Sequence, residues 1–549
     1  MDKRRFNFDM RRSIRGRGSD STRFLPFKRK YKPRHSTHTA ERDSYTEQYR
    51  HSDLRRREQH QQQQQDQMRA TFRTCVLNMI IMDLQTLSLV EEEGFQRFVN
   101  YLHPCPDTTL TASWIRTELL EMYEHVKLKV QKELCWAKDL TLSAELWISG
   151  KDESYLTVTG HFISENWELK SYVLETAHLL GEHTPEKVHQ ELWRISTEWK
   201  ISEKIHVVVV NVDGMKKVKS KARWTYMPCF GHTLQKVFRE AMDNPGWRDL
   251  LKKCQHVVAF VHQKTTDGRH VQLSQSLSVD WLPVLTMLEK ITDNWETISE
   301  VLSDNLNEEL WLNERELRML GSMVIALREV KDILREMGKS GYSSVSSIIP
   351  LSDKLQYILR GHQQNGNKVA QRISEKYDHH IGNIKQNQWF TLSTALDPNF
   401  KGSVLHHTGA EVIKMHIRNE MHKLRSGSNS REEGAEDLIL QRYTESGTTT
   451  LSPLKFWAAK KELKELPFVA RKYLTVVSTA IPMERVTQQE KSWLISNRRK
   501  CLELEDINMM LFLNNNHQTV NSSPLEDQRP FTSLCSPRPG HQRSSSPEY

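Results

Sequence analysis

Alternation of apolar and polar residues is the feature that most constrains the fold of this 549-residue chain. From residue 140 to 148 every second side chain is apolar, a pattern typical of a strand with one buried face. Residues 155–163 and 169–176 repeat it after short polar turns, which predicts an antiparallel meander. A helix that starts at Thr184-Pro185 follows, and residues 205–210 then form the apolar run of a strand covered on both faces. These segments predict an α/β fold built on a mixed sheet.

The rest of the chain is expected to be helical or disordered, and 549 residues are enough for two or three packed units. Both ends contain few aliphatic residues, so they lack the apolar surface that folding requires. Between the ends, apolar residues recur at helical spacing on both sides of the strand region. The predicted parts are a disordered basic and Gln-rich arm (1–68), a helical N-terminal unit (69–138), the first part of the sheet core (139–240), an all-α insertion (241–452) with a surface loop (425–437), a helical C-terminal region (453–513) and a disordered Ser/Pro tail (514–549).

The net charge of +9 is concentrated near the N-terminus. Residues 1–57 hold 18 Lys and Arg against 7 Asp and Glu, whereas the remainder holds 60 against 62. Such an arm attracts phosphate backbones or acidic proteins without reading sequence. Within it, Lys28, Arg29, Lys30 and Lys32 form a cluster of the kind that nuclear import receptors or DNA bind, with a merely solvated tail as the alternative. We therefore predict a nuclear protein that contacts DNA largely through non-specific phosphate contacts.

Cysteine usage and hydropathy also indicate the cellular compartment of the protein. The seven cysteines are scattered and form no C-x-x-C pair, which indicates a reducing compartment and argues against a disulfide framework. Apolar runs such as residues 75–82 are much shorter than the roughly 20 residues that span a bilayer. The charged N-terminus differs from a signal peptide. We predict neither secretion nor a membrane association.

Seven short words occur in order between about residues 71 and 515, which is about four-fifths of the chain. They are LSAELWIS (142–149), SYLTVTGHFI (154–163), MPCFGHTLQ (227–235), LDPNFK (396–401), PLKFW (453–457), IPMERV (481–486) and NRR (497–499). In this order they resemble the core and the C-terminal region of hAT-type DNA transposases. One word alone is weak evidence, whereas the ordered series is strong.

The resemblance implies an RNase H-like mixed sheet that is interrupted by a large all-α insertion, with helical N-terminal and C-terminal segments. It also implies a homodimer formed through residues 453–513, where Trp457, Phe468, Tyr473 and Leu474 are the expected apolar anchors. Within the family the chain is most similar to the domesticated zinc finger BED domain-containing proteins. This sequence contains no C-x2-C followed by H-x3-5-H, the ligand spacing of such a finger, so we expect no BED finger here.

Three carboxylates that hold two divalent metals carry catalysis in such transposases. By the resemblance, Glu145 occupies the first position, where the family has Asp, and Glu484 occupies the third. Asn211 falls in the second position, and Asp213 lies two residues beyond it. A neutral amide binds Mg²⁺ weakly, so we predict a non-functional site without a cofactor, and Mg²⁺ only if residual catalysis survives. The alternative is that Glu145, Asn211 and Glu484 have purely structural roles.

Two further features bear on chemistry. Cys229 and His232 lie one helical turn apart, but two ligands do not make a zinc site, and packing with hydrogen bonding is the favoured alternative. The family's insertion opens with an Arg-Trp pair that works near the DNA hairpin, and here Asp280-Trp281 replaces it. By the resemblance, this replacement is a second sign of lost chemistry.

The sequence therefore predicts a catalytically inactive, transposase-derived nuclear protein rather than an enzyme. It is expected to bind DNA, to regulate transcription and to act as a dimer, with other nuclear proteins as further partners. Two alternatives remain open. One is a residually active hAT transposase or nuclease that uses Glu145, Asp213 and Glu484, and the other is a protein-interaction scaffold without DNA binding.

Overall fold

The computed structural model describes residues 39–102, 110–149, 151–218, 224–264, 281–338, 344–405, 409–425, 435–480 and 497–521. The chain divides into two compact units between Phe72 and Arg73, and each is described by itself below. Among the described residues, no helix combines the length and the apolar character that crossing a membrane requires.

Helix α1 (Thr39–Asp83) makes up the described part of the first unit and continues into the second. The expectation of a disordered arm is therefore wrong for residues 39–68, which are helical. The physical reason lies in the composition, because Arg, Glu and Gln are good helix formers and no Gly or Pro occurs between residues 39 and 83. The predicted disordered tail is corrected in the same way, since α20 (Ile507–Asn521) extends to residue 521.

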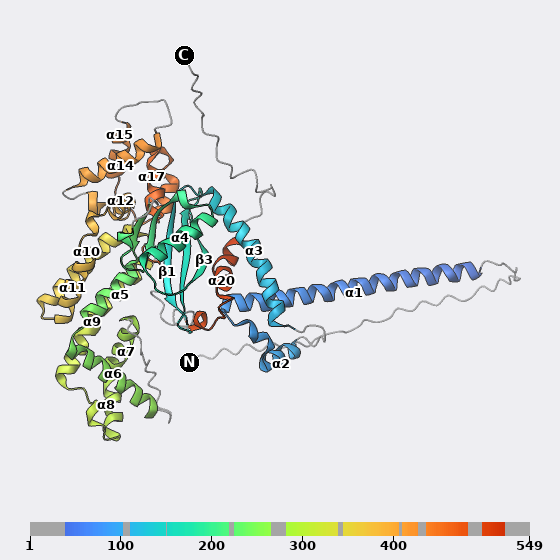
Figure 1. Ribbon diagram of the computed structural model, residues 1–549, viewed down its shortest axis with the longest axis horizontal. Helices are drawn as coiled ribbons and strands as arrows, with labels where there is room; N and C mark the ends of the chain where they lie inside the picture. Colours follow the sequence, from blue (N-terminus) through green and yellow to red (C-terminus); the bar gives the residue numbers. More distant parts are fainter. Residues whose placement is uncertain are drawn as a thin grey trace, which may run out of the picture. The chain divides into compact units, whose positions relative to one another are not determined.

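The second unit is built on one five-stranded mixed sheet (Figure 1). Its strands are β1 (Leu140–Ile148), β2 (Ser154–Ile163), β3 (Leu169–Leu179), β4 (Ile205–Val210) and β5 (Thr225–Pro228), in the order β3-β2-β1-β4-β5. The first three strands pair antiparallel, and β4 pairs parallel with β1 and with β5. This mixed sheet, together with the helical segments around it, confirms the predicted α/β fold class. Strand β5 was not predicted.

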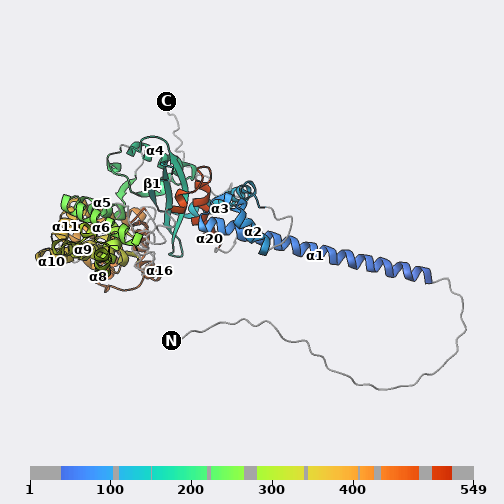
Figure 2. The same ribbon diagram turned by 90° about the horizontal axis from the view of Figure 1, so that it is seen from below.

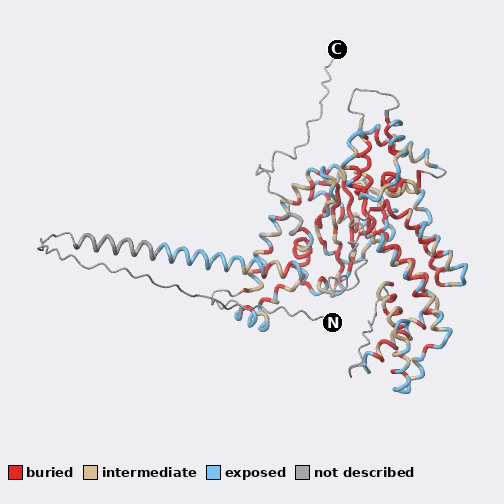
Figure 3. The backbone as a smooth tube through the Cα atoms, turned by 180° about the vertical axis from the view of Figure 1, so that it is seen from behind, coloured by how far each residue is buried: buried red, intermediate tan, exposed pale blue. Residues whose placement is uncertain are grey.

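Helices cover this sheet and bury it almost throughout, as the red tube in Figure 3 shows. Helix α4 (Pro185–Glu198) begins as predicted, with the Thr184 hydroxyl accepting a hydrogen bond from the Lys187 amide. Its buried face includes Val188, Leu192 and Ile195. Helix α3 (Ala112–Trp136) packs against α20, and both Figure 1 and Figure 2 place α20 beside the sheet. The N-terminal segments of this unit also include α2 (Glu93–Leu102).

The helical insertion forms a core that is continuous with one side of the sheet. Its apolar residues recur at helical spacing and are buried where the helices meet. The helices are α5 (Phe230–Ala241), α6 (Pro245–Lys264), α7 (Trp281–Asp293), α8 (Trp295–Asp304), α9 (Glu314–Gly338), α10 (Ile348–Gln364), α11 (Lys368–Ile381), α12 (Gln388–Leu396), α13 (Gly402–Leu405), α14 (Ala410–Arg425) and α15 (Ala435–Glu445), followed by α16 (Pro453–Ala459) and α17 (Leu466–Leu474). The predicted loop at 425–437 falls mostly on residues 426–434, which lie outside the described residues.

The segment after α17 ties the insertion to the sheet. The Val345 amide donates to the Val476 carbonyl at 3.0 Å, and the Phe230 amide donates to the Ser478 carbonyl at 3.0 Å. Phe230 is the first residue of α5, which directly follows β5. Residues 476–480 therefore lie beside the ends of β4 and β5, and they bring the later part of the chain close to the expected catalytic positions.

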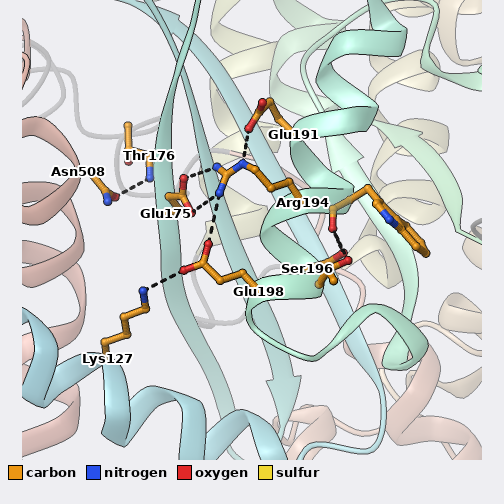
Figure 4. Close-up of polar contacts among 10 residues, drawn as sticks. Lys127, Glu175, Thr176, Glu191, Arg194, Ser196, Glu198 and Asn508 are labelled. Atoms are coloured by element: carbon orange, nitrogen blue, oxygen red, sulfur yellow. Dashed lines mark hydrogen bonds and ion pairs between the residues drawn. The ribbon is translucent and has the colours of Figure 1, made fainter.

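Asparagine side chains of α20 satisfy the outer edge of β3. Asn516 accepts a hydrogen bond from the Val173 amide at 3.0 Å and donates one to the Val173 carbonyl at 2.7 Å. Asn508 accepts from the Thr176 amide at 2.9 Å, a contact that is also visible in Figure 4. An amide side chain carries one acceptor and two donors, so it can replace a neighbouring peptide group. Helix α20 thus takes the place of a sixth strand at this edge.

Candidate active site

Glu145 lies in the middle of β1, and its side chain is buried against Arg499. Two parallel hydrogen bonds join the pair, from Nη1 to Oε2 at 3.1 Å and from Nη2 to Oε1 at 3.0 Å. Less than a tenth of either side chain is exposed. This bidentate geometry is the strongest form of an Arg–carboxylate pair, and it engages both carboxylate oxygens.

Trp147 fixes the other face of the Arg499 guanidinium. The Arg499 Cζ atom lies 3.8 Å from the centre of the Trp147 ring, within the range of a cation–π contact. The indole is itself held, because its Nε1 donates to the Thr157 hydroxyl at 2.9 Å and its ring stacks on Tyr155 at 5.0 Å. Arg499 is therefore fixed by an acid and an aromatic ring of β1, and residues of β2 hold that ring in place.

Asn211 directly follows β4, and its side-chain amide forms hydrogen bonds with the backbone of β1. Its Oδ1 accepts from the Leu146 amide at 2.7 Å, and its Nδ2 donates to the Leu146 carbonyl at 2.9 Å. The parallel pairing of β1 with β4 ends at Ala144 and Val210, so the Asn211 amide extends that ladder by one step. Its oxygen already accepts a strong hydrogen bond within the protein, which leaves a weak ligand for a hard cation.

Asp213 lies beyond the strand and forms an ion pair with Lys236 of α5 at 3.0 Å. Its side chain is 74% exposed. The hydrogen bond from Lys236 lowers the pKa of this carboxyl below its usual value. Asp213 is thus engaged with the insertion, whereas Glu145 is engaged with Arg499.

Several predicted site residues lie outside the described residues. These are Glu484, the four cations Lys28, Arg29, Lys30 and Lys32, and Asp280 of the replaced Arg-Trp pair. Trp281 is described, and it is buried at the start of α7. Among the described residues, no group of three or more His, Cys, Asp or Glu side chains is arranged to hold a metal ion.

Cys229 and His232 bracket the start of α5. The Cys229 thiol is buried and accepts a hydrogen bond from the Ala480 amide at 3.2 Å, and burial raises its pKa. Burial lowers the pKa of His232. A buried thiol with a raised pKa is a poor thiolate ligand, and here it links α5 to the segment that follows α17.

The four expected dimer anchors do not form one exposed surface, which corrects that expectation. Trp457, Tyr473 and Leu474 are at most 3% exposed and pack inside their own chain. Trp457 Nε1 donates to a backbone carbonyl of α12 at 2.8 Å, and the Tyr473 ring lies 4.7 Å from that of Trp389. Of the four, Phe468 alone is exposed, at 48%. The apolar pattern that indicated an interface reflects packing against α12 and α14.

Sequence reasoning missed the role of Arg499 and of the acid and lysine in the word LDPNFK. Asp397 is buried, accepts from the Ser346 hydroxyl at 2.6 Å, and has its pKa raised to about 6 by burial. Lys401 donates to the Tyr443 carbonyl and to the Ser446 hydroxyl at the end of α15. Residues 396–401 therefore form buried polar contacts that hold segments of the insertion together. The NRR word already contained Arg499, but nothing near it in sequence identifies Glu145 as its partner.

Comparison with known proteins gives four findings. The ZBED1 RNase-like domain family matches residues 143–222. Zinc finger BED domain-containing protein 4 of Homo sapiens is 22% identical over 422 residues, which are 71% of this chain and 35% of that protein. The putative AC transposase of Zea mays is 29% identical over 131 residues, 23% of this chain and 16% of that protein. A putative transcriptional regulator of Talaromyces stipitatus is 21% identical over 367 residues, 57% of this chain and 42% of that protein.

The aligned part of the chain thus spans less than half of each of these relatives. The family match runs from β1 to beyond β4, so it includes the positions of Glu145, Asn211 and Asp213. The sheet and its helical insertion agree with the fold that the ordered words imply. This chain is thus similar over part of its length to the AC transposases and to zinc finger BED domain-containing protein 4, and it contains a match to the ZBED1 RNase-like domain.

Proposed function

We propose that this chain is a catalytically inactive, transposase-derived nuclear protein that binds DNA and regulates transcription. The observation that carries the proposal is the pairing of Glu145 with Arg499. Two divalent metals need charged oxygen ligands, and a buried guanidinium on the first carboxylate repels them. A metal would have to displace Arg499 from both the acid and the Trp147 ring.

The second position supports the same conclusion. The Asn211 amide is held by the Leu146 backbone, and Asp213 is paired with Lys236. For a residually active enzyme, Asp213 would have to leave Lys236 and Arg499 would have to leave Glu145. Each change gives up a formed ion pair, and the buried one costs more because its members would lose their partners inside the protein.

DNA binding and the nucleus are proposed on the basis of the basic N-terminal sequence and the relatives. The cluster Lys28, Arg29, Lys30 and Lys32 favours phosphate contacts. The relatives include proteins named as a transposase and as a putative transcriptional regulator. A homodimer belongs to the proposal as well, with Phe468 as its exposed apolar residue.

A cleavage assay tests the catalytic part. The full-length protein is incubated with labelled duplex DNA and Mg²⁺ or Mn²⁺, and strand breaks are followed on denaturing gels. We expect the protein to bind the DNA and to introduce no strand breaks. The matched variants are Glu145→Gln and Glu153→Gln, since both acids are close in sequence but only Glu145 occupies a catalytic position. Cleavage that Glu145→Gln abolishes and Glu153→Gln preserves would overturn the proposal.

A salt titration tests the DNA-binding part. We compare the full-length protein with a variant in which Lys28, Arg29, Lys30 and Lys32 are changed to Gln, using duplex DNA of random sequence. Each lost phosphate contact should reduce the slope of log affinity against log salt by about 0.9. Binding that is independent of both salt and the four cations contradicts the phosphate-contact proposal. Complete absence of binding to any DNA favours the alternative of a protein-interaction scaffold without DNA binding.

A further inference from the structure

An aromatic cluster lies on α4 and on the residue before β5, and it includes neither Glu145 nor Arg499. Trp193 of α4 is 41% exposed, and its ring centre lies 5.6 Å from that of Trp224, which directly precedes β5. The His189 ring approaches Trp224 at 5.8 Å. We call these three residues the aromatic surface. Trp193 is thus exposed although it packs on the half-buried ring of Trp224, and exposed aromatic side chains in a cluster are typical of binding surfaces.

The aromatic surface is held in place by its neighbours. Trp224 Nε1 donates to the Ser202 carbonyl at 3.2 Å. His189 Nδ1 and the Tyr226 hydroxyl share a hydrogen bond of 2.5 Å. Trp193 belongs to α4, whose opposite face is buried against the sheet. The rings are therefore preorganised, so a ligand would pay little to order them.

Two exposed cations lie on a short helix that packs against the elements around these rings. Lys216 and Lys217 belong to the short helix η3 (Met215–Lys217), which packs against α4 and β5. The turn before them fits closely, because Gly214 has φ +84° and a Cβ there would meet the Pro185 ring at 3.1 Å. The left-handed turn thus sets the two lysines against the beginning of the same helix that carries Trp193.

Two of the three acidic side chains of α4, Glu191 and Glu198, are already paired. Arg194 donates to Glu191 at 2.8 Å and to Glu198 at 3.3 Å, and it also binds Glu175, as Figure 4 shows. Glu198 in turn accepts from Lys127 at 3.0 Å. By sequence, residues 216–223 contain five Lys and Arg and no Asp or Glu. Of these cations, Lys216 and Lys217 are described and exposed, so they can attract a phosphate backbone.

We propose that the aromatic surface and Lys216 and Lys217 form a binding site for unpaired nucleobases on a phosphate backbone. Aromatic rings bind bases by stacking, which tolerates any sequence, and lysines contact the adjacent phosphates. Either single-stranded DNA or single-stranded RNA supplies this chemistry. The site rests on the proposed nucleic-acid function, but it uses neither the N-terminal cations nor the catalytic positions.

The alternative occupants fit less well. An apolar peptide would use the rings but gain nothing from Lys216 and Lys217. Intact duplex DNA would use the lysines, whereas its bases are stacked on each other and present no free face to Trp193. The combination of rings and cations is what favours an unpaired strand.

Fluorescence anisotropy of labelled oligo(dT) and oligo(rU) with the full-length protein tests the site. All proteins carry the Gln substitutions at Lys28, Arg29, Lys30 and Lys32, which remove the basic cluster of the arm from every comparison. Trp193→Ala should weaken binding about 5- to 150-fold, the loss of one stacked base, while Trp193→Phe should retain most of the affinity. The matched control is Trp136→Ala on α3, where the side chain is 64% exposed.

Salt dependence provides the second readout. Lys216→Gln with Lys217→Gln should reduce the slope of log affinity against log salt by about 1.4, or ~0.7 for each phosphate contact on a single strand. The control pair is Lys455→Gln with Lys461→Gln, both exposed in the C-terminal helices. Equal losses for Trp193→Ala and Trp136→Ala, or equal slopes for the two lysine pairs, overturn the site. A preference for oligo(dT) or oligo(rU) identifies the natural strand.

The outcomes separate this site from the wider proposal. If duplex binding through the N-terminal cations persists and Trp193→Ala has no effect on single strands, the proposed function stands and this site does not. If duplex DNA is not bound but the single strand is held in a Trp193-dependent way, the phosphate-contact proposal fails and the site stands.

Discussion

Arg499 binds Glu145 through two hydrogen bonds of 3.0 and 3.1 Å, although 354 residues separate them in the sequence. The pair joins the central strand of the sheet to the segment just before α20. At the position that the resemblance assigns to the first metal-binding carboxylate, a cation of the chain itself contacts the acid. The Glu145–Arg499 pair thus contributes to the connection between the sheet and the C-terminal segment.

Arg499→Met should destabilise the folded chain by about 3–5 kcal/mol, because it leaves a buried carboxylate without its guanidinium partner. Adding Glu145→Gln should recover a large part of this loss, since the charge is then removed with its partner. The midpoint of urea unfolding measures both effects. The control is Lys151→Met, which breaks an ion pair with Glu503 at the surface and should change the midpoint little. Equal effects for the two single variants would contradict the prediction.

Substitution of Trp457 should affect folding, whereas substitution of Phe468 should affect association of the chains. Trp457→Ala removes a buried ring and its hydrogen bond to α12, so we expect a loss of about 3–5 kcal/mol in the free energy of unfolding. Phe468→Ser changes a half-exposed side chain and should cost about 1 kcal/mol or less. Urea unfolding measures the free energy of unfolding, and sedimentation velocity measures the dissociation constant of any dimer. If dimers form and Phe468→Ser leaves their dissociation constant unchanged, the interface lies elsewhere.

Asn516→Leu should uncover the Val173 amide and carbonyl at the outer edge of β3. Unmade hydrogen bonds of buried groups cost about 1–3 kcal/mol each, and an open edge recruits other strands. We expect a lower unfolding midpoint and concentration-dependent oligomers in light scattering. The neighbouring Asn515→Leu is the control, because Asn515 donates within its own helix, to Leu511. Identical behaviour of the two variants would show that α20 does not protect the edge.

His161 should make stability depend on pH between about 4 and 6.5. It lies on β2 between Ser143 and Ser171, with 2.8 Å hydrogen bonds to both, and burial lowers its pKa to about 4. The folded state therefore binds fewer protons than the unfolded state in this window. The contribution is complete above about pH 6.5, is lost as the pH falls towards 4, and amounts to about 3 kcal/mol.

The pH effect is measured as the unfolding midpoint of His161→Gln against the unchanged chain from pH 4 to 7. The variant should show a flatter profile in that window. His125→Gln, at an exposed position of α3, serves as the control and should keep the profile of the unchanged chain. A profile for His161→Gln that parallels the unchanged chain would exclude this histidine as the cause.

The strands could be predicted because their signal is local. Alternation over residues 140–148 and the apolar run 205–210 give the bounds of β1 and β4 as observed. Strand β5 has four residues and ends in Pro228, which is too short for alternation to appear, and it exists because β4 offers a parallel partner. Helix α1 was not predicted because the few aliphatic residues of the arm indicated disorder. A sequence that cannot form a core can still favour a helix.

The candidate site could be predicted only in part. The word LSAELWIS located Glu145, the resemblance placed Asn211 after the apolar run 205–210, and the amide at residue 211 already indicated weak metal binding. The partners could not be predicted, because Arg499 and the Leu146 backbone are brought there by the sheet and the C-terminal segment. The dimer residues show the reverse error. Trp457 and Tyr473 have the composition of an interface, but the helices of the insertion cover them.

The contact between Val173 and Asn516 also has a consequence for the time course of synthesis. The two residues are 343 positions apart, so at about 5–20 residues per second the ribosome needs about 20–70 seconds to produce the second after the first. During that interval β3 has left the ribosome while the helix that completes its edge does not yet exist. The outer edge of β3 therefore stays without its Asn508 and Asn516 partners throughout this interval of synthesis.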